Sequence, residues 1–358
     1  MKRAFLSFVT LVTATSLSAQ MQPAPAHPSP QQPKNVQLLK GMSPMELIRA
    51  MQFISVSLGV NCDFCHVFKP GGERDFGSDD KEEKRTARDM IRLVMDDNTK
   101  FFHDRPVVSC NTCHRGSPNP VNVPVLPVSA PQPRPKGPPP DAKSAMPTRD
   151  DIVARYSKAL GNSDPKAIAT MELKGTRDMA GGSAPIDVMI SHGKTRINTI
   201  TPDGQMVIVA NGNTGWMADA HGSTHPMQQI QLDSTNSVLE ALRLILPTDI
   251  PADARVGKDR VGDRDVWVLT SPNGSTGRQR LYFDTGSGLL VRRLTFTGTP
   301  IGSIPQQTDF DDYRDVGGFK LPFVVHLDSV DRGASRVVRY TEITPNAKID
   351  ENVFVQPQ

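Results

Sequence analysis

One short pattern occurs twice in this chain and uses all four of its cysteines. Residues 62–66 read CDFCH and residues 110–114 read CNTCH, so each copy has two cysteines three positions apart and a histidine directly after the second. Three positions are about one helical turn, which lets both sulfur atoms reach one porphyrin while the imidazole faces its iron. This is the pattern of covalent c-type haem attachment. The sequence therefore predicts two covalently bound haem c groups.

Each motif would supply two thioether bonds and one iron ligand. The thioether residues are Cys62, Cys65, Cys110 and Cys113, and the proximal iron ligands are His66 and His114. A structural zinc site could use the four cysteines, but it would leave both histidines without a role. Two disulfides would leave the histidines unexplained in the same way.

The N-terminus has the features of a secretory signal peptide. Lys2 and Arg3 precede an apolar run over residues 4–17, and small residues follow as far as Ala19. We therefore expect residues 1–19 to direct export to the periplasm, where the protein is soluble or peripheral to a membrane. Residues 20–36 are expected to form a disordered leader. The formal net charge of +3 gives no electrostatic case for nucleic acid as a partner.

Two helices are expected around the motifs. Ser43 and Glu46 form a capping box, and Gly59 ends the first helix. Its apolar face consists of Leu47, Met51, Ile54 and Leu58. A second helix is expected from residue 79 or 80 to residue 102, after a charged, glycine-rich loop at 67–78. Its apolar stripe is Ala87, Met90, Ile91 and Val94, and its solvated face carries the expected pairs Asp80 with Lys84 and Asp96 with Lys100.

The distal iron ligands are less constrained by the sequence. Met51 is either the sixth ligand of the first haem or a core residue. Met90, Met95 and His103 are all candidates for the second haem, and spacing alone does not choose between them. Because this segment has few apolar residues for its length, we expect the haems to supply part of its core.

The order of these features resembles the cytochrome c subunit of photosynthetic reaction centres. The resemblance covers residues 36–120 and rests on Arg49-Ala50-Met51 before the first motif, Ala87-Arg88-Asp89-Met90 on the second helix, and residues 110–116 (CNTCHRG). It implies that Met51 and Met90 are the distal ligands of the first and second haem, with Met95 in the core.

This chain departs from the resemblance in its number of motifs. The family carries four haems, whereas two motifs are present here. In the family, a histidine near the position of His103 ligates a haem of the half that is absent. His103 is therefore vestigial, exposed, or an alternative ligand.

The second part of the chain has a different character. Residues 118–148 are rich in proline and predict an extended linker. Beyond it, helices at 150–160 and 237–246 and eight short segments with alternating apolar residues predict an antiparallel curved sheet. These segments are 167–175, 186–190, 205–210, 266–270, 279–284, 289–296, 321–327 and 336–343.

This part resembles outer-membrane lipoprotein-sorting and lipoprotein-carrier proteins, which form an open half-barrel. The resemblance rests on residues 281–284 (LYFD), 288–292 (GLLVR), 312–314 (DYR) and 318–322 (GFKLP). It implies a lipid or lipoprotein ligand between sheet and helices. The alternative is a packed scaffold that docks the cytochrome.

The expected fold is thus multidomain. A small all-α di-haem cytochrome c domain at 37–117 precedes the linker at 118–148 and a β-rich domain at 149–358, which is an antiparallel curved sheet with one or two helices. His221 and His225 are not expected to form a metal site. A group of aspartates is expected in turns and an edge strand rather than as a catalytic pair: Asp309, Asp311, Asp312 and Asp315.

Histidine and methionine together would make each iron six-coordinate, with no open position for a substrate. We therefore expect an electron carrier rather than an enzyme, which moves single electrons between protein redox partners such as a membrane electron-transfer complex. Two alternatives stay open. One is a di-haem peroxidase-like oxidoreductase, and the other is a lipid- or lipoprotein-binding protein whose haem domain senses redox state.

Overall fold

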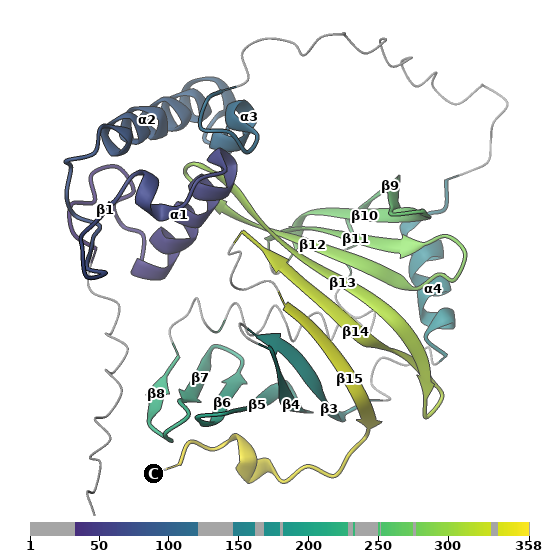
Figure 1. Cartoon of the computed structure of the whole chain (residues 1–358). Coiled ribbons are helices and arrows are strands. Elements are labelled where there is room, and N and C mark those ends of the chain that lie inside the picture. Colours follow the sequence, from purple (N-terminus) through teal and green to yellow (C-terminus); the bar gives the residue numbers. More distant parts are fainter. Residues whose placement is uncertain are drawn as a thin grey trace, which may run out of the picture.

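The computed structural model describes residues 33–120 and 146–357, apart from gaps at 162–167, 180–181, 228–231, 233–249, 251, 275–276 and 331–335. The predicted signal peptide, most of the leader and linker, and the predicted helix at 237–246 lie outside the described residues. We call residues 33–120 the helical segment and residues 146–357 the sheet segment (Figure 1).

The helical segment contains three α-helices around the two motifs. They are α1 (Pro44–Leu58), α2 (Glu82–Phe102) and α3 (Cys110–His114). The first motif begins on a 3-10 turn, η1 (Cys62–Phe64), and the second forms α3. The stretch predicted as a loop contains a short hairpin of β1 (Val67–Phe68) and β2 (Arg74–Asp75). α2 begins later than predicted because the residues before Glu82 fold back as a loop.

Both ends of α1 are determined locally, as the sequence predicts. The Ser43 hydroxyl accepts a hydrogen bond from the Glu46 amide at 3.4 Å, and the Glu46 carboxylate accepts one from the Ser43 amide at 2.7 Å. Gly59 ends the helix at φ +69°, and a Cβ there would lie 2.1 Å from the carbonyl oxygen of Gly116. Only glycine fits this position, so α1 can approach the residues that follow the second motif.

The fully buried face of α1 is not the predicted apolar face. Ala50, Phe53 and Ser57 are buried, whereas the predicted residues are all half-buried: Leu47, Met51, Ile54 and Leu58. These are neighbouring stripes of one helix. Ile54 and Leu58 border a cavity, while the buried stripe packs against protein.

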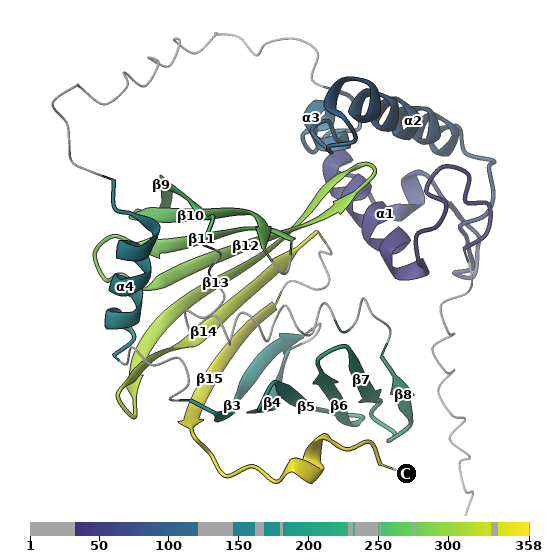
Figure 2. The same cartoon turned by 180° about the vertical axis from the view of Figure 1, so that it is seen from behind.

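The sheet segment forms one antiparallel sheet of thirteen strands in the order β8-β7-β6-β5-β4-β3-β15-β14-β13-β12-β11-β10-β9. The bounds are β3 (Thr170–Met179), β4 (Gly182–Ser191), β5 (Lys194–Thr201), β6 (Gly204–Asn211), β7 (Thr214–Ala218), β8 (Thr224–Pro226), β9 (Arg255–Val261), β10 (Arg264–Gly274), β11 (Gly277–Asp284), β12 (Leu290–Thr299), β13 (Gly302–Val316), β14 (Phe319–Ser329) and β15 (Arg336–Pro345). Figures 1 and 2 show that the sheet is curved. It is open, since β8 and β9 lie at its two ends.

One helix of this segment, α4 (Arg149–Ala159), packs on the sheet (Figure 2). Ile152, Tyr156 and Leu160 enter the main hydrophobic core, where the rings of Tyr156 and Phe283 are 5.2 Å apart. The amide of Lys320 donates a hydrogen bond to the Leu160 carbonyl at 2.8 Å. The predicted antiparallel curved sheet is therefore present, with few helices.

All eight predicted segments overlap strands, but the sequence did not predict β5, β7, β8, β9 or β13. The last of these matters most, because β13 lies between β12 and β14. The prediction that Asp309 and its neighbours occupy turns and an edge strand is therefore wrong. Asp309 accepts two hydrogen bonds from Arg292 on β12, at 2.6 and 2.7 Å. β13 forms hydrogen bonds to β12 on one side and to β14 on the other, and this pairing keeps it a strand despite its polar composition.

The hairpin of β12 and β13 extends from the sheet to the helical segment (Figure 1). Ile301 and Ile304 of this hairpin are buried in one hydrophobic cluster with Leu39, Phe53 and Ile91 of the helical segment. We call this group the shared cluster. It joins parts of the chain that are about two hundred residues apart.

The main core gives a direct test of the sheet. Phe283→Ala should lower the free energy of unfolding by about 3–5 kcal/mol, because Phe283 is 1% exposed and its loss leaves a cavity. Ile200→Ala, at an exposed site on β5, should change it by less than about 0.5 kcal/mol. Denaturant unfolding followed by the fluorescence of Trp216 and Trp267 measures both. If both substitutions lowered the free energy of unfolding equally, Phe283 would not be part of a buried core.

Candidate haem site

A cavity of about 490 Å³ lies between α1, α2 and α3. Its walls are mainly apolar and include Ile54, Leu58, Ile91, Leu93, Val94 and Val108. Several predicted haem residues line the same cavity: Cys65, Met90, Cys110, Cys113 and His114. The fold therefore brings the complete second motif together with Met90 on a neighbouring helix.

The imidazole of His114 is oriented by a backbone contact. Its Nδ1 lies 3.0 Å from the carbonyl oxygen of Ser117, and since a carbonyl can only accept, Nδ1 carries the hydrogen. The lone pair is then on Nε2. Proximal histidine ligands are held in this way, with the other ring nitrogen donating to a carbonyl.

His66 of the first motif is half-buried in a different environment. Its ring meets the ring of Phe76 edge-on, with centroids 5.1 Å apart. The Phe76 backbone also lies close to the ring, but Nδ1 is buried and has no hydrogen-bond partner among the described residues. Burial, followed by the positive charge of Lys84, lowers the pKa of His66. His66 is thus kept neutral, the form in which an imidazole binds iron.

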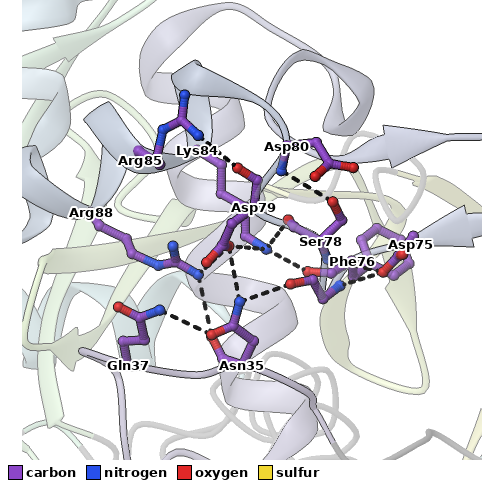
Figure 3. A network of polar contacts seen from close by, with 11 residues as sticks. Asn35, Gln37, Asp75, Phe76, Ser78, Asp79, Asp80, Lys84, Arg85 and Arg88 are labelled. Carbon is purple, nitrogen blue, oxygen red and sulfur yellow. Dashed lines mark hydrogen bonds and ion pairs between the residues drawn. The ribbon is translucent and has the colours of Figure 1, made fainter.

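A polar network holds the loop beside His66 (Figure 3). The buried ammonium of Lys84 donates to the carbonyls of Phe76 at 2.9 Å and Ser78 at 2.6 Å, and lies 3.2 Å from the Asp79 carboxylate. Arg88 donates to the same carboxylate at 2.7 Å. α2 thereby fixes the position of the residues that pack on the His66 ring.

Part of this network contradicts the sequence predictions. Lys84 was expected on a solvated face in a pair with Asp80, but it is 9% exposed and pairs with Asp79. Asp80 precedes the helix, so the two residues are not one helical turn apart. Asn35, in the predicted disordered leader, donates to Asp79 at 2.9 Å. The pair of Asp96 with Lys100 is confirmed at 3.4 Å.

The candidate distal ligands are in three different settings. Met90 is 40% exposed and lines the cavity with His114. Met51 and Met95 are half-buried and pack against the shared cluster. His103 is exposed and ends α2 in the left-handed region at φ +53°. The structure thus brings Met90 to the second motif, and Met51 is not among the residues that line this cavity.

The residues present fit haem c, most completely at the second motif. There, two thiols, a thioether sulfur and an imidazole oriented through Nδ1 surround one apolar cavity. None of the four cysteines forms a disulfide, and burial raises the pKa of Cys65 and Cys110. At the first motif, two thiols and a neutral imidazole are in place.

Comparison with known proteins finds a family and relatives similar to the helical part of the chain. Residues 10–146 match the photosynthetic reaction centre cytochrome C subunit family. Cytochrome c-554 of Chloroflexus aurantiacus is 41% identical over 91 residues, and the photosynthetic reaction center cytochrome c subunit of Thermochromatium tepidum is 40% identical over 91 residues. Each match is 24% of this chain and 21% of the relative. The chain thus spans about a fifth of the length of these curated relatives, and the predicted resemblance is confirmed.

The sheet segment has similar solved structures at low identity. A LolA superfamily protein from Nitrosomonas europaea has a TM-score of 0.40 and 10% identity, covering 58% of this chain and 98% of that chain. A putative outer membrane lipoprotein-sorting protein domain from Vibrio parahaemolyticus has a TM-score of 0.37 and 11% identity, covering 56% of this chain and 94% of that chain. Similarity at this level says nothing about a ligand.

Two further properties concern the described residues only. None of their helices has an apolar stretch sufficient to cross a bilayer. No three histidine, cysteine, aspartate or glutamate side chains among them gather into a group that could hold a metal ion. His221 and His225 are both exposed.

The network beside His66 predicts a pH-dependent stability. Hydrogen bonds from Arg88, Asn35 and Lys84 hold the pKa of Asp79 well below its usual range. The ionised carboxylate therefore stabilises the folded chain above the unfolded-state pKa of about 3.9, and this stabilisation is lost as the pH falls toward the folded-state pKa. Asp79→Asn should lower the midpoint of urea unfolding at about pH 7, and the deficit should shrink below about pH 4.

Asp80→Asn is the matched control for this measurement. Asp80 is the exposed neighbour of Asp79, and its side chain makes no ion pair within the described part of the chain. It should unfold like the wild type at both pH values. A deficit for Asp79→Asn that stays constant down to about pH 3 would show that the charge of Asp79 is not responsible.

Proposed function

We propose that the protein is an exported di-haem c-type cytochrome that passes single electrons between redox partners. The observation that supports this most directly is the apolar cavity lined by Cys110, Cys113, His114 and Met90. The match of residues 10–146 to a cytochrome family supports the same cofactor. The number of haems in the proposal rests on the two motifs.

The proposal gives each candidate residue one role. Cys62, Cys65, Cys110 and Cys113 form the thioether bonds, His66 and His114 are the proximal ligands, and Met51 and Met90 are the distal ligands. Haem c, when bound, supplies an iron that alternates between the ferric and ferrous states and so carries one electron. With both axial positions filled by the protein, no position is left for a substrate, so we assign no catalytic residue.

The residues around the cavity would orient the proximal ligand and raise the reduction potential of the haem. The Ser117 carbonyl holds the His114 ring in the tautomer that a proximal ligand needs. A methionine thioether opposite histidine raises the reduction potential. The apolar walls have the same effect, because burial disfavours the form with the greater charge.

Location and partners follow from the sequence and the relatives. Residues 1–19 would direct export, and the site of action would be the periplasm, in solution or at the membrane surface. The partners would be proteins, among them a membrane electron-transfer complex of the reaction centre type. We also propose that the chain is divided into a cytochrome domain at 37–117, a linker at 118–148 and a β-rich domain at 149–358.

Protein-film voltammetry of the full-length, haem-loaded protein tests the proposal. The account predicts two reversible one-electron waves and no catalytic current when hydrogen peroxide is added. A sustained peroxide-dependent current would contradict it and favour the peroxidase alternative. An integrated charge of one electron per chain would contradict the second haem.

The assignment of Met90 has a matched control on the same helix. Met90→Ala should remove the methionine-to-iron charge-transfer absorption of one haem and lower the potential of that haem, because methionine ligation raises it. Met95→Ala should leave the absorption and potential of the second haem unchanged, since Met95 does not line the cavity that contains His114. Visible absorption and potentiometry of the oxidised variants measure this. An unchanged spectrum for Met90→Ala would show that another residue is the ligand.

A further inference from the structure

The tip of the β12–β13 hairpin is part of the interior of the helical segment. Ile301 is 0% exposed and Ile304 is 7% exposed, and both lie in the shared cluster with Ala50 and Phe53 of α1. Ile91 of α2 belongs to the same cluster. The hairpin therefore covers part of the buried stripe of α1, beside Leu39 and Ile91 of the helical segment.

Gly302 lies at the closest approach of the hairpin to the helices. A Cβ at this position would be 2.8 Å from the Cβ of Ser109 and 3.1 Å from two ring carbons of Phe53. Gly302 also has φ +142°, where an L side chain is strained. No larger residue fits without moving one of these neighbours.

The two neighbours of Gly302 belong to the elements that carry haem ligands. Phe53 is on α1, two positions after Met51, and Ser109 is the N-cap residue of α3, directly before Cys110. One residue of the sheet segment therefore contacts a neighbour of the candidate ligand of the first haem and a neighbour of the second motif.

α1 lies between the hairpin and the cavity. Its buried stripe, with Ala50 and Phe53, packs on the hairpin, while Ile54 and Leu58 face the cavity. Met51, two positions before Phe53, does not line the cavity and packs against the shared cluster itself. A helix of fifteen residues moves as a unit, so a displacement of Phe53 displaces Met51 as well.

We propose that Ile301, Gly302 and Ile304 are positioning residues for the distal ligand of the first haem. They hold α1 in the position that lets Met51 reach the iron held by His66, so the sheet segment is a structural part of the electron carrier. This inference rests on the proposed function, and specifically on Met51 as a ligand.

The test compares two glycines of the same hairpin in the full-length, haem-loaded protein. Gly302→Val forces the hairpin and the helices apart. Gly298→Val is the matched control, because nothing lies within 4 Å of a Cβ at Gly298. The readouts are the methionine-to-iron charge-transfer absorption, the midpoint potential of each haem, and the radius of gyration from small-angle X-ray scattering.

Gly302→Val should lose the charge-transfer absorption of one haem, about half of the total, and lower the potential of that haem. Its radius of gyration should increase as the hairpin separates from α1. Gly298→Val should match the wild type in all three measurements. A Gly302→Val protein with unchanged absorption and potentials would overturn the proposal, whatever its radius of gyration.

A second variant tests the proposal if Gly302→Val does not fold. Ile301→Ala removes buried atoms without adding any, and it should lower the potential of the same haem in the same direction while both haems stay attached. An unchanged potential would count against the proposal. A wild-type protein that lacks the methionine band altogether would instead contradict the proposed function, so the two failures are distinguishable.

Discussion

The contact of α1 with the β12–β13 hairpin is the interaction on which the rest of the helical segment depends. α1 has two apolar stripes, and each must be covered. The stripe of Ala50 and Phe53 is covered by Ile301 and Ile304 from the sheet segment, while Ile54 and Leu58 face the cavity. A segment with so few apolar residues cannot cover both stripes by itself. The hairpin supplies part of the missing surface, and under the proposed function a bound macrocycle would supply the rest.

The two haem motifs are supported in different ways. The second motif is short and helical, and its histidine is oriented by the Ser117 carbonyl within its own loop. The first motif depends on residues outside its own loop, because α2 holds the loop beside His66 through Lys84. The first site is therefore more dependent on the packing of the whole segment, which includes α1 and the hairpin.

The sequence predicted the features that short-range chemistry determines. The capping box at Ser43, the stop at Gly59 and the two motifs all depend on neighbours within a few positions, and the caps are confirmed. The sequence did not predict β13, the burial of Lys84 or the role of Gly302. Gly302 depends on Phe53 and Ser109, which are far away in the sequence, whereas Lys84 and β13 depend on how a nearby loop and the neighbouring strands pack. No local pattern marks any of these partners. Gly302 in particular lies between Ile301 and Ser303, and nothing in that stretch of sequence indicates contact with Phe53.

The central claim is that both motifs hold haem c with histidine and methionine as axial ligands. Intact-mass spectrometry of the purified full-length protein, combined with near-infrared and EPR spectroscopy of its oxidised form, tests this most directly. The account predicts a mass increase of two haem groups per chain and two low-spin irons with methionine-to-iron charge-transfer absorption. A single haem, or an iron that is high-spin or ligated by two histidines, would contradict it.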